Sequence, residues 1–247
     1  MAHALGVDRN AILLDPTRYT VPATFAALVE RRLRHEPIAY IIGTRGFWSI
    51  DLAVGPGALV PRADSETLLI AAQAHFAGRA PATVLDLGTG PGTLLLAALD
   101  EWPAQGLGID YSPHALDYAR ANAATLGMAD RARFIRGSWA GAIVGQFDLI
   151  LANPPYIATD ERLPPEVHDH EPHAALFAGS DGLDDYRILA EQLPALIAPC
   201  GAAVIEIGST QGPSVTALLE AQGLHVALHH DYGANPRALV ATKVSAT

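Results

Sequence analysis

The sequence is poor in cysteine, in lysine and in long hydrophobic runs. Cys200 is the one cysteine, which excludes an intrachain disulfide and a cysteine-rich zinc site. No stretch reaches the roughly 18 uninterrupted apolar residues of a membrane-spanning helix. Asp8 and Arg9 interrupt the N-terminus before the apolar core of a signal peptide develops. We therefore expect a cytoplasmic protein with no membrane partner.

Basic residues are also scarce relative to acidic ones. One lysine and 15 arginines stand against 26 acidic residues, which gives a formal net charge of −10. Because a nucleic-acid-binding protein must neutralise several phosphates with lysine and arginine, this balance argues against direct nucleic-acid binding. Half of the 247 residues are apolar, which is enough for a large buried core and excludes a disordered acidic polymer.

From residue 83 onward, apolar strand-like runs alternate with helical stretches. This alternation predicts an α/β fold with a Rossmann-like, mostly parallel sheet that helices cover on both faces. The predicted strands are 83–87, 106–110, 132–136, 147–152, 202–207, 224–230 and 237–242, and the predicted helices lie near 92–100, 113–126, 183–197 and 211–222. Such sheets bind ligands at the carboxyl ends of their central strands, which directs attention to the loops after residues 87, 110 and 152.

The chain divides into three zones. Residues 1–42 predict a short helical N-terminal segment, residues 43–61 a connecting β-hairpin, and residues 62–247 the main α/β domain. Within the hairpin, simple alternation puts Phe47 on one face with Ser49, Asp51 and Ala53, and puts Trp48, Ile50, Leu52 and Val54 on the other.

A glycine-rich loop follows the first predicted strand of the main domain: Gly88, Thr89, Gly90, Pro91 and Gly92. Glycines at this spacing let the backbone turn sharply and approach a ligand closely, with a helix N-terminus behind them. Asp110 ends the next strand, where a carboxylate can accept from both hydroxyls of a ribose. Loop and acid together indicate an adenosine-bearing ligand, either a nicotinamide cofactor or S-adenosylmethionine.

The loop after the strand at 147–152 is the most informative segment, with the sequence Asn153-Pro154-Pro155-Tyr156. Two prolines stiffen it and remove backbone donors. The Asn153 amide oxygen and the Pro154 carbonyl can then converge on one NH₂ group, against the aromatic face of Tyr156. Two such acceptors would aim the lone pair of a planar nitrogen at an electrophile and stabilise the positive charge that develops on it. This pattern predicts methyl transfer from a sulfonium donor to an amide or a base amine.

With these motifs the chain resembles the HemK/PrmC-type peptide chain release factor glutamine methyltransferases, a class I S-adenosylmethionine-dependent family. Residues 34–43 are similar to the family pattern GEPLAYIxG, residues 60–66 to IPRPDTE, and residues 137–139 to GDW. Residues 171–172, 181–187 and 206–208 are also typical of the family. The resemblance implies a seven-stranded methyltransferase sheet behind a small helical N-terminal domain.

The resemblance also implies a role for each matching residue. The cofactor would be S-adenosylmethionine, and the substrate would be the glutamine of the Gly-Gly-Gln motif of a release factor. By resemblance, residues 88–92 line the methionine end of the cofactor, Asp110 binds its ribose, Trp139 flanks its adenine, Asn153 and Pro154 hold the substrate amide, and Pro155 and Tyr156 shape its slot. No metal is implied.

The chain departs from the family pattern at two positions and in its N-terminal length. Ser138 stands where an aspartate is usual, and a hydroxyl accepts a hydrogen bond more weakly than a carboxylate does. Pro91 replaces a usual serine and removes one N–H donor from the glycine loop. The helical segment is short for the docking domain of the family.

Two alternatives to a glutamine methyltransferase stay open. A DNA or RNA adenine amino-methyltransferase would use the same loop, because the adenine amine is also a planar nitrogen, although the shortage of basic residues disfavours it. A methyltransferase fold that acts only as a binding module is compatible with Ser138. A nicotinamide oxidoreductase would leave residues 153–156 unexplained.

Of three further features, two are assigned to structure and one is left open. The histidines and acids at 168–173 are interpreted as a solvated loop rather than a metal site, because they lack a fixed ligand spacing. Arg62 and Glu66 could either pair at a helix start or reach the active site. Cys200 is predicted to lie in a turn ahead of a strand.

Overall fold

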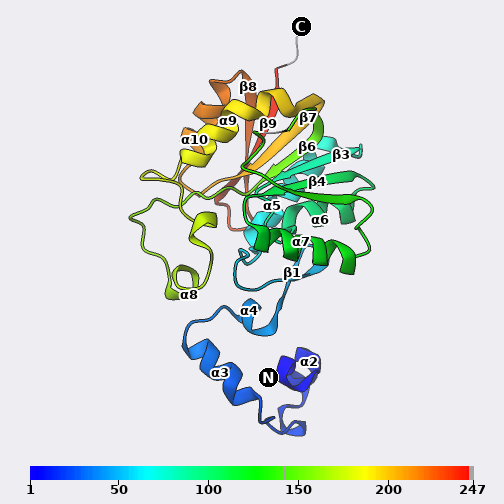
Figure 1. The fold of residues 1–247 in the computed structure, drawn as a ribbon, viewed down its shortest axis with the longest axis vertical. Coiled ribbons are helices and arrows are strands. Elements are labelled where there is room, and N and C mark those ends of the chain that lie inside the picture. Colours follow the sequence, from blue (N-terminus) through cyan, green and yellow to red (C-terminus); the bar gives the residue numbers. More distant parts are fainter. Residues whose placement is uncertain (142, 245–247) are drawn as a thin grey trace.

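The computed structural model describes residues 1–141 and 143–244 and is built around a seven-stranded sheet (Figure 1). Residues 142 and 245–247 of the predicted main domain lie outside the described residues. The strand order is β5-β4-β3-β6-β7-β9-β8. Strand β9 runs in the direction opposite to the other strands of this sheet. The strands are β3 (Thr83–Leu87), β4 (Gln105–Asp110), β5 (Ala132–Arg136), β6 (Phe147–Ala152), β7 (Ile197–Glu206), β8 (Leu224–His230) and β9 (Pro236–Lys243). The predicted Rossmann-like α/β class is confirmed.

Helices cover both faces of this sheet, as Figure 1 shows. One apolar core lies under α5 (Glu66–Phe76), α6 (Thr93–Glu101) and α7 (Pro113–Thr125). The other lies under α9 (Asp184–Leu196) and α10 (Gly212–Glu220). The central strands are buried on both sides, which explains why they read as continuous apolar runs in the sequence. Among the described residues, no helix has the length and apolarity needed to span a membrane.

The strand order fixes where a ligand can bind. From β3 the chain moves outward through β4 and β5, and then returns to place β6 on the other side of β3. The loops after β3 and β6 therefore leave the sheet in opposite directions and open a crevice at the carboxyl edge of the sheet. The glycine loop and the loop that begins at Asn153 both lie at this point.

The N-terminal segment is a chain of short helices that extends away from the sheet (Figure 1). It contains α1 (Ala2–Leu5), α2 (Arg9–Leu14), the 3-10 turn η1 (Pro16–Arg18), α3 (Phe25–Leu33) and α4 (Ile38–Ile42). No residue of α1, α2 or α3, all of which the structure describes, is buried. Helix α4 has buried residues: Tyr40 is buried and its hydroxyl donates to the Ala58 carbonyl at 2.6 Å.

The predicted hairpin is present, but its alternation differs from the expected one. Strands β1 (Thr44–Phe47) and β2 (Ile50–Ala53) pair antiparallel, with Phe47 opposite Ile50. Trp48 has a φ of +54°, so it belongs to the two-residue turn between the strands. The turn interrupts the period of two, so Phe47 is buried on the same side as Ile50 and Leu52 rather than facing outward with Asp51. Simple alternation was wrong here because it ran through a turn.

Strand β7 begins earlier than predicted. It starts at Ile197, and Cys200 lies within it at a φ of +61° rather than in a preceding turn. Pairing with β6 shifts from Phe147–Ile197 to Leu149–Ala202, so β7 advances five residues while β6 advances two. The extra residues form a bulge, which produces the turn-like Pro199-Cys200-Gly201 sequence inside a strand.

The connecting loops carry the remaining short helices. They are the 3-10 turn η2 (Ala63–Ser65) before α5, α8 (Pro165–His168), and the 3-10 turn η3 (His173–Ala175). The loop that contains α8 and η3 contacts the N-terminal segment, since Arg32 pairs with Glu166 at 2.5 Å and a His170 ring nitrogen lies 2.9 Å from the Arg34 carbonyl. This loop thus bridges the N-terminal helices and the carboxyl edge of the sheet.

Candidate functional site

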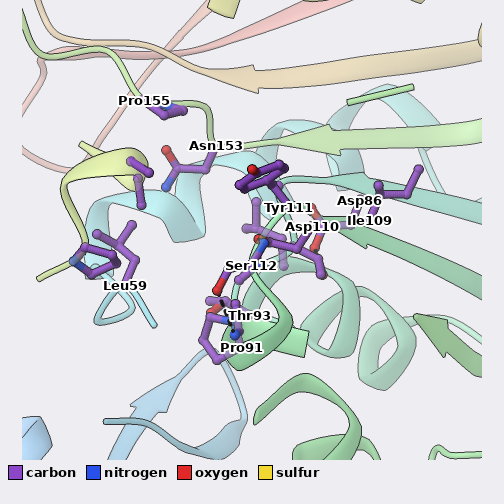
Figure 2. Close-up of a pocket in the computed structure, with 18 of the residues that line it drawn as sticks. Leu59, Asp86, Pro91, Thr93, Ile109, Asp110, Tyr111, Ser112, Asn153 and Pro155 are labelled. Atoms are coloured by element: carbon purple, nitrogen blue, oxygen red, sulfur yellow. Dashed lines mark hydrogen bonds between the residues drawn. The ribbon is translucent and has the colours of Figure 1, made fainter. Parts of the chain in front are cut away.

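A cavity of about 300 Å³ opens at the carboxyl ends of β3, β4 and β6. Figure 2 shows its labelled lining residues, with Asn153 and Pro155 from the loop after β6 and with Asp110, Tyr111 and Ser112 from the loop after β4. The other predicted ligand-binding residues that line it are Gly88, Thr89, Gly90, Pro91 and Trp139. Residues from three loops that are distant in sequence therefore surround one cavity.

The glycine loop adopts the left-handed conformations that its sequence suggests. Gly88, Gly90 and Gly92 have φ values of +73°, +57° and +87°. A Cβ on Gly88 would lie 3.3 Å from the ring of Trp139, so a side chain there would crowd the cavity wall. Gly92 is not among the described residues that line the cavity: it caps α6, and a Cβ there would meet the Leu96 side chain at 2.8 Å. Gly92 thus serves packing between loop and helix.

Asp110 stabilises this loop while it faces the cavity. Its carboxylate accepts from the Gly90 N–H and from the Ser112 N–H, each at 2.8 Å. Burial raises the pKa of Asp110, and the hydrogen bonds from Ser112 and Gly90 oppose the rise. Each carboxylate oxygen accepts more than one hydrogen bond, so capacity is left for ligand hydroxyls.

Asp86 is a second acid at the cavity, and the sequence analysis did not single it out. It is buried near the end of β3, where Oδ2 accepts from the Thr89 hydroxyl at 2.6 Å and from the Leu95 N–H at 3.1 Å. Its Oδ1 has no hydrogen-bond partner among the described residues. Burial raises the pKa of Asp86 to about 7. A buried acceptor without a partner at a cavity wall is a feature that a polar ligand group can satisfy.

Trp139 forms part of the cavity wall beside the glycine loop. Its ring lies over Gly88, and its indole N–H donates to Asp185 Oδ1 at 3.0 Å. Its φ of +48° is unusual for a bulky residue and is held by this surrounding structure. Ser138 lines the same cavity beside it. The flat indole face is therefore fixed in orientation.

A second cavity of about 200 Å³ adjoins the first. Pro154 and Tyr156 line this smaller cavity, whereas Pro155 lines the larger one. Leu59, Arg62, Asn153 and Ala175 line both. The loop predicted to hold the acceptor nitrogen therefore lies on the boundary between two cavities, with Asn153 accessible from each.

Tyr156 is held firmly in this position. Its carbonyl accepts from Gln211 Nε2 at 2.9 Å, and a Cβ on Gly182 would lie 2.3 Å from that carbonyl. Burial raises the pKa of Tyr156 to about 12, so its phenol stays neutral at physiological pH. Tyr156 can therefore offer a neutral aromatic wall.

Arg62 pairs with a partner that neither prediction named. It forms an ion pair with Glu171 at 2.5 Å, and the buried Glu171 also accepts from the Val60 N–H at 3.1 Å. Glu66 instead accepts from the Trp48 N–H at 2.9 Å, which ties α5 to the hairpin. The Arg62–Glu66 pairing was wrong, because the loop that carries Glu171 folds back over the site. The alternative, that Arg62 reaches the active site, matches its place in the lining of both cavities.

The histidine-rich stretch makes structural contacts. A His168 ring nitrogen lies 2.8 Å from the Asp169 carboxylate, and a His173 ring nitrogen lies 2.7 Å from the His168 carbonyl. Across residues 1–141 and 143–244, no group of three or more histidines, cysteines and acids is arranged to hold a metal ion.

The sequence analysis missed several residues that the fold brings to the site: Leu59, Ser65, Asp86, Asp185 and Glu206. Asp86 had a readable signal, since an acid near the end of a strand and just before a glycine loop is placed to hold that loop. Asp185 and Glu206 lie in segments that matched the family pattern, but nothing local in them indicated a role. Leu59 and Ser65 reach the site only through long-range folding.

Solved structures with this fold include other methyltransferases. A methyltransferase from Pyrococcus furiosus superimposes with a TM-score of 0.59 at 18% identity, covering 88% of this chain and 98% of that one. A ribosomal protein L11 methylase from Lactobacillus delbrueckii subsp. bulgaricus gives a TM-score of 0.56 at 20% identity, covering 74% of this chain and 81% of that one. These likenesses show the fold.

Sequence families and curated relatives are more specific. Residues 80–182 match the family described as "Methyltransferase domain", and residues 1–43 match "PrmC N-terminal domain". The release factor glutamine methyltransferase of Rhodospirillum rubrum is 45% identical over 99% of this chain and 77% of its own length. Those of Bradyrhizobium diazoefficiens and Xylella fastidiosa are 41% and 43% identical, over 98% and 97% of this chain and 85% and 90% of their lengths. The chain therefore belongs to the family of release factor glutamine methyltransferases.

Proposed function

We propose that this protein transfers a methyl group from S-adenosylmethionine to the side-chain amide nitrogen of the glutamine in the Gly-Gly-Gln motif of a peptide chain release factor. The observation that supports this most strongly is the meeting of two cavities at Asn153. A methyl donor in the larger cavity and an amide in the smaller one would face each other across this residue. A release factor substrate would also place the enzyme in the cytoplasm.

The larger cavity offers groups suited to S-adenosylmethionine. Asp110 is placed for the ribose hydroxyls, the glycine loop leaves room for close backbone approach, and the fixed ring of Trp139 provides a flat surface for adenine. The unpartnered Oδ1 of Asp86 provides an acceptor for a positively charged ammonium group. When bound, the cofactor supplies an electrophilic sulfonium methyl group.

The smaller cavity offers the acceptors that an amide needs. We assign Asn153 Oδ1 and the Pro154 carbonyl to the two hydrogens of the substrate NH₂ group, and Pro155 and Tyr156 to the walls of its slot. An amide nitrogen has a delocalised lone pair, so acceptors that orient its hydrogens aim that lone pair at the methyl group. They also stabilise the positive charge that develops on nitrogen, an effect larger in the transition state than in the ground state.

No strong base is required in this scheme. The methylated nitrogen carries two protons and a positive charge until it releases one proton, and an N-protonated amide is acidic enough to lose that proton to water. Catalysis is then mainly positioning and electrostatic stabilisation. The neutral phenol of Tyr156 fits a role as a wall rather than as a proton acceptor.

The test is methylation of a folded release factor with labelled S-adenosylmethionine, followed by mass spectrometry of the Gly-Gly-Gln peptide. We expect one added methyl group on the glutamine. A release factor with Gly-Gly-Glu in place of Gly-Gly-Gln is the matched control and should stay unmodified. An unmodified glutamine together with methylated adenine in an oligonucleotide would overturn the proposal in favour of an adenine amino-methyltransferase.

A further inference from the structure

Behind Asn153 lies a buried chain of polar side chains that the mechanism above does not use. The Asn153 Nδ2 group donates to the Ser65 hydroxyl oxygen at 3.2 Å. The Ser65 hydroxyl also lies close enough to the Glu206 carboxylate to lower the pKa of that carboxyl. Ser65 and Glu206 are each only 2% exposed. These contacts therefore lie at the inner walls of the site, nearly out of reach of solvent.

The fold brings these three residues together from distant parts of the sequence. Asn153 follows β6 and Glu206 ends β7, and these strands pair in parallel with Ala152 beside Ile205. Ser65 ends η2, at the start of α5, which packs against β7 and β9. Glu206 also lines the smaller cavity, and its Oε2 has no hydrogen-bond partner among the described residues.

The direction of the hydrogen bonds follows from the chemistry of the groups. An ionised carboxylate only accepts, so the single proton of the Ser65 hydroxyl is donated to Glu206. The Ser65 oxygen is then left as an acceptor toward Asn153. Asn153 must meet it with its NH₂ group, and its carbonyl oxygen Oδ1 is thereby directed away from Ser65. Reversing the amide would place two acceptors against each other at a buried position, which is unfavourable.

We propose that Ser65 and Glu206 are positioning residues that fix the orientation of the Asn153 amide, so that an acceptor rather than a donor faces the substrate. This inference rests on the proposed function and deepens it. With Oδ1 presented, the site favours a substrate NH₂ group and disfavours a carboxylate, which has no proton to donate. The pair would thus select glutamine over glutamate.

The environment of Glu206 is compatible with this role. Burial raises the pKa of Glu206 to about 7, and the hydrogen bond from Ser65 together with the charge of Arg237 opposes the rise. The titratable and charged groups that act on Glu206 or are acted on by it are Arg62, Asp64, Tyr156, Tyr186 and Arg237. Arg237 also pairs with Asp231 at 3.2 Å, so its positive charge acts on both Asp231 and Glu206. The carboxylate is therefore ionised in mildly alkaline solution.

The test compares Glu206→Gln with Glu220→Gln, the same change at an exposed position at the end of α10. A glutamine at 206 can present either its NH₂ or its carbonyl to Ser65, so the direction of the hydrogen bonds is no longer fixed, and the Ser65 proton can turn to Asn153 Oδ1. At about pH 8.5, we expect Glu206→Gln to lower kcat about tenfold or more, with KM for the release factor changed less than kcat. S-adenosylmethionine binding by calorimetry should match that of Glu220→Gln. Equal kcat in the two variants would overturn the inference.

Ser65 provides a second pair of variants. Ser65→Ala removes the link and should lower kcat in the same way, whereas Ser65→Thr keeps the hydroxyl and should restore most of the lost turnover. The family pattern quoted above carries threonine at this position. Thermal unfolding of both variants shows whether a loss of turnover comes from a loss of the fold. An inactive, folded Ser65→Thr beside an active Ser65→Ala would contradict a role for the hydroxyl.

A measurement that does not depend on turnover separates this inference from the proposed function. In ¹⁵N-labelled protein, the Asn153 side-chain NH₂ signal can be assigned by its loss in Asn153→Asp. We expect slow hydrogen exchange in the wild type and exchange about tenfold faster or more in Glu206→Gln, because Ser65 no longer accepts that NH₂. Identical exchange in both would overturn the inference even if the enzyme methylates release factor. Failure of the wild type to methylate release factor would instead overturn the proposed function.

Discussion

The two cavities that meet at Asn153 are built in different ways. The larger one includes a local unit, the glycine loop after β3 and the end of β4, in which main-chain N–H groups hold the acid Asp110, and distant segments complete its wall. The smaller one is assembled from residues 59–62, 153–157, 163–176 and 206. Side-chain contacts across long stretches of chain hold it, such as Arg62–Glu171 and Asn153–Ser65. The larger cavity therefore contains a locally encoded part, whereas the smaller one depends throughout on contacts between distant segments.

The largest effect should come from the residue that the two cavities share. We expect Asn153→Ala to lower kcat about 100-fold or more, as occurs when an acceptor or donor that acts in the transition state is removed. Calorimetry should show nearly unchanged S-adenosylmethionine affinity, because the contacts of the larger cavity remain. Unchanged kcat would remove Asn153 from the mechanism. A loss of both turnover and S-adenosylmethionine affinity would show that the two cavities do not act independently.

The converse change is in the larger cavity. Asp110→Ala removes a half-buried carboxylate from the predicted ribose position, and we expect S-adenosylmethionine to bind about tenfold to thirtyfold more weakly. Turnover at saturating cofactor should fall much less. Asp117→Ala is the matched control, since its side chain is 74% exposed on the same loop–helix unit. A fall in kcat with unchanged S-adenosylmethionine binding would contradict the assignment of cofactor binding to the larger cavity.

The ion pair over the smaller cavity tests its dependence on long-range contacts. Glu171→Ala deprives Arg62 and the Val60 N–H of their acceptor, and we expect the free energy of unfolding to fall by about 2 kcal/mol in urea titrations. This value of about 2 kcal/mol allows for solvent screening of the charge of Arg62, whose side chain is 38% exposed. Glu166→Ala, which breaks the exposed pair with Arg32, should cost less than about 1 kcal/mol. Equal losses in the two variants would contradict a special role for Glu171.

The last prediction concerns a property in which the two cavities should behave alike. Each has one buried carboxyl, Asp86 or Glu206, whose pKa burial raises to about 7. The folded state then binds more protons than the unfolded state above about pH 4, so the free energy of unfolding falls as pH rises toward about 7. Asp86→Asn should flatten this slope in denaturant titrations at several pH values. A slope as steep in the variant as in the wild type would show that Asp86 titrates normally.

The sequence predicted the parts of the site that a single strand–loop unit encodes. Gly88, Asp110 and the loop from Asn153 could be recognised because glycine spacing, a terminal acid and paired prolines each imply a local backbone geometry. The packing of Gly92 could not be predicted from the loop alone, because its neighbour Leu96, one turn into α6, decides what a side chain there would meet. Even in this local unit, packing was harder to predict than backbone conformation.

The parts that could not be predicted depend on residues distant in sequence. Nothing near Ser65 indicates that a hydroxyl will meet Asn153, 88 positions away. Arg62 had a plausible partner four residues away in Glu66, but the loop that carries Glu171 supplied a buried one. Likewise, the bulge at Cys200 follows from pairing with β6, which the local Pro-Cys-Gly sequence does not specify.

A structure of the enzyme with S-adenosylhomocysteine and a glutamine-containing Gly-Gly-Gln peptide tests most directly whether the two cavities meet in function at Asn153. We expect the cofactor product in the larger cavity and the glutamine amide in the smaller one, with the amide nitrogen within hydrogen-bonding distance of Asn153 Oδ1 and the Pro154 carbonyl. A glutamine bound elsewhere, or an Asn153 that presents its NH₂ group to the substrate, would contradict this arrangement.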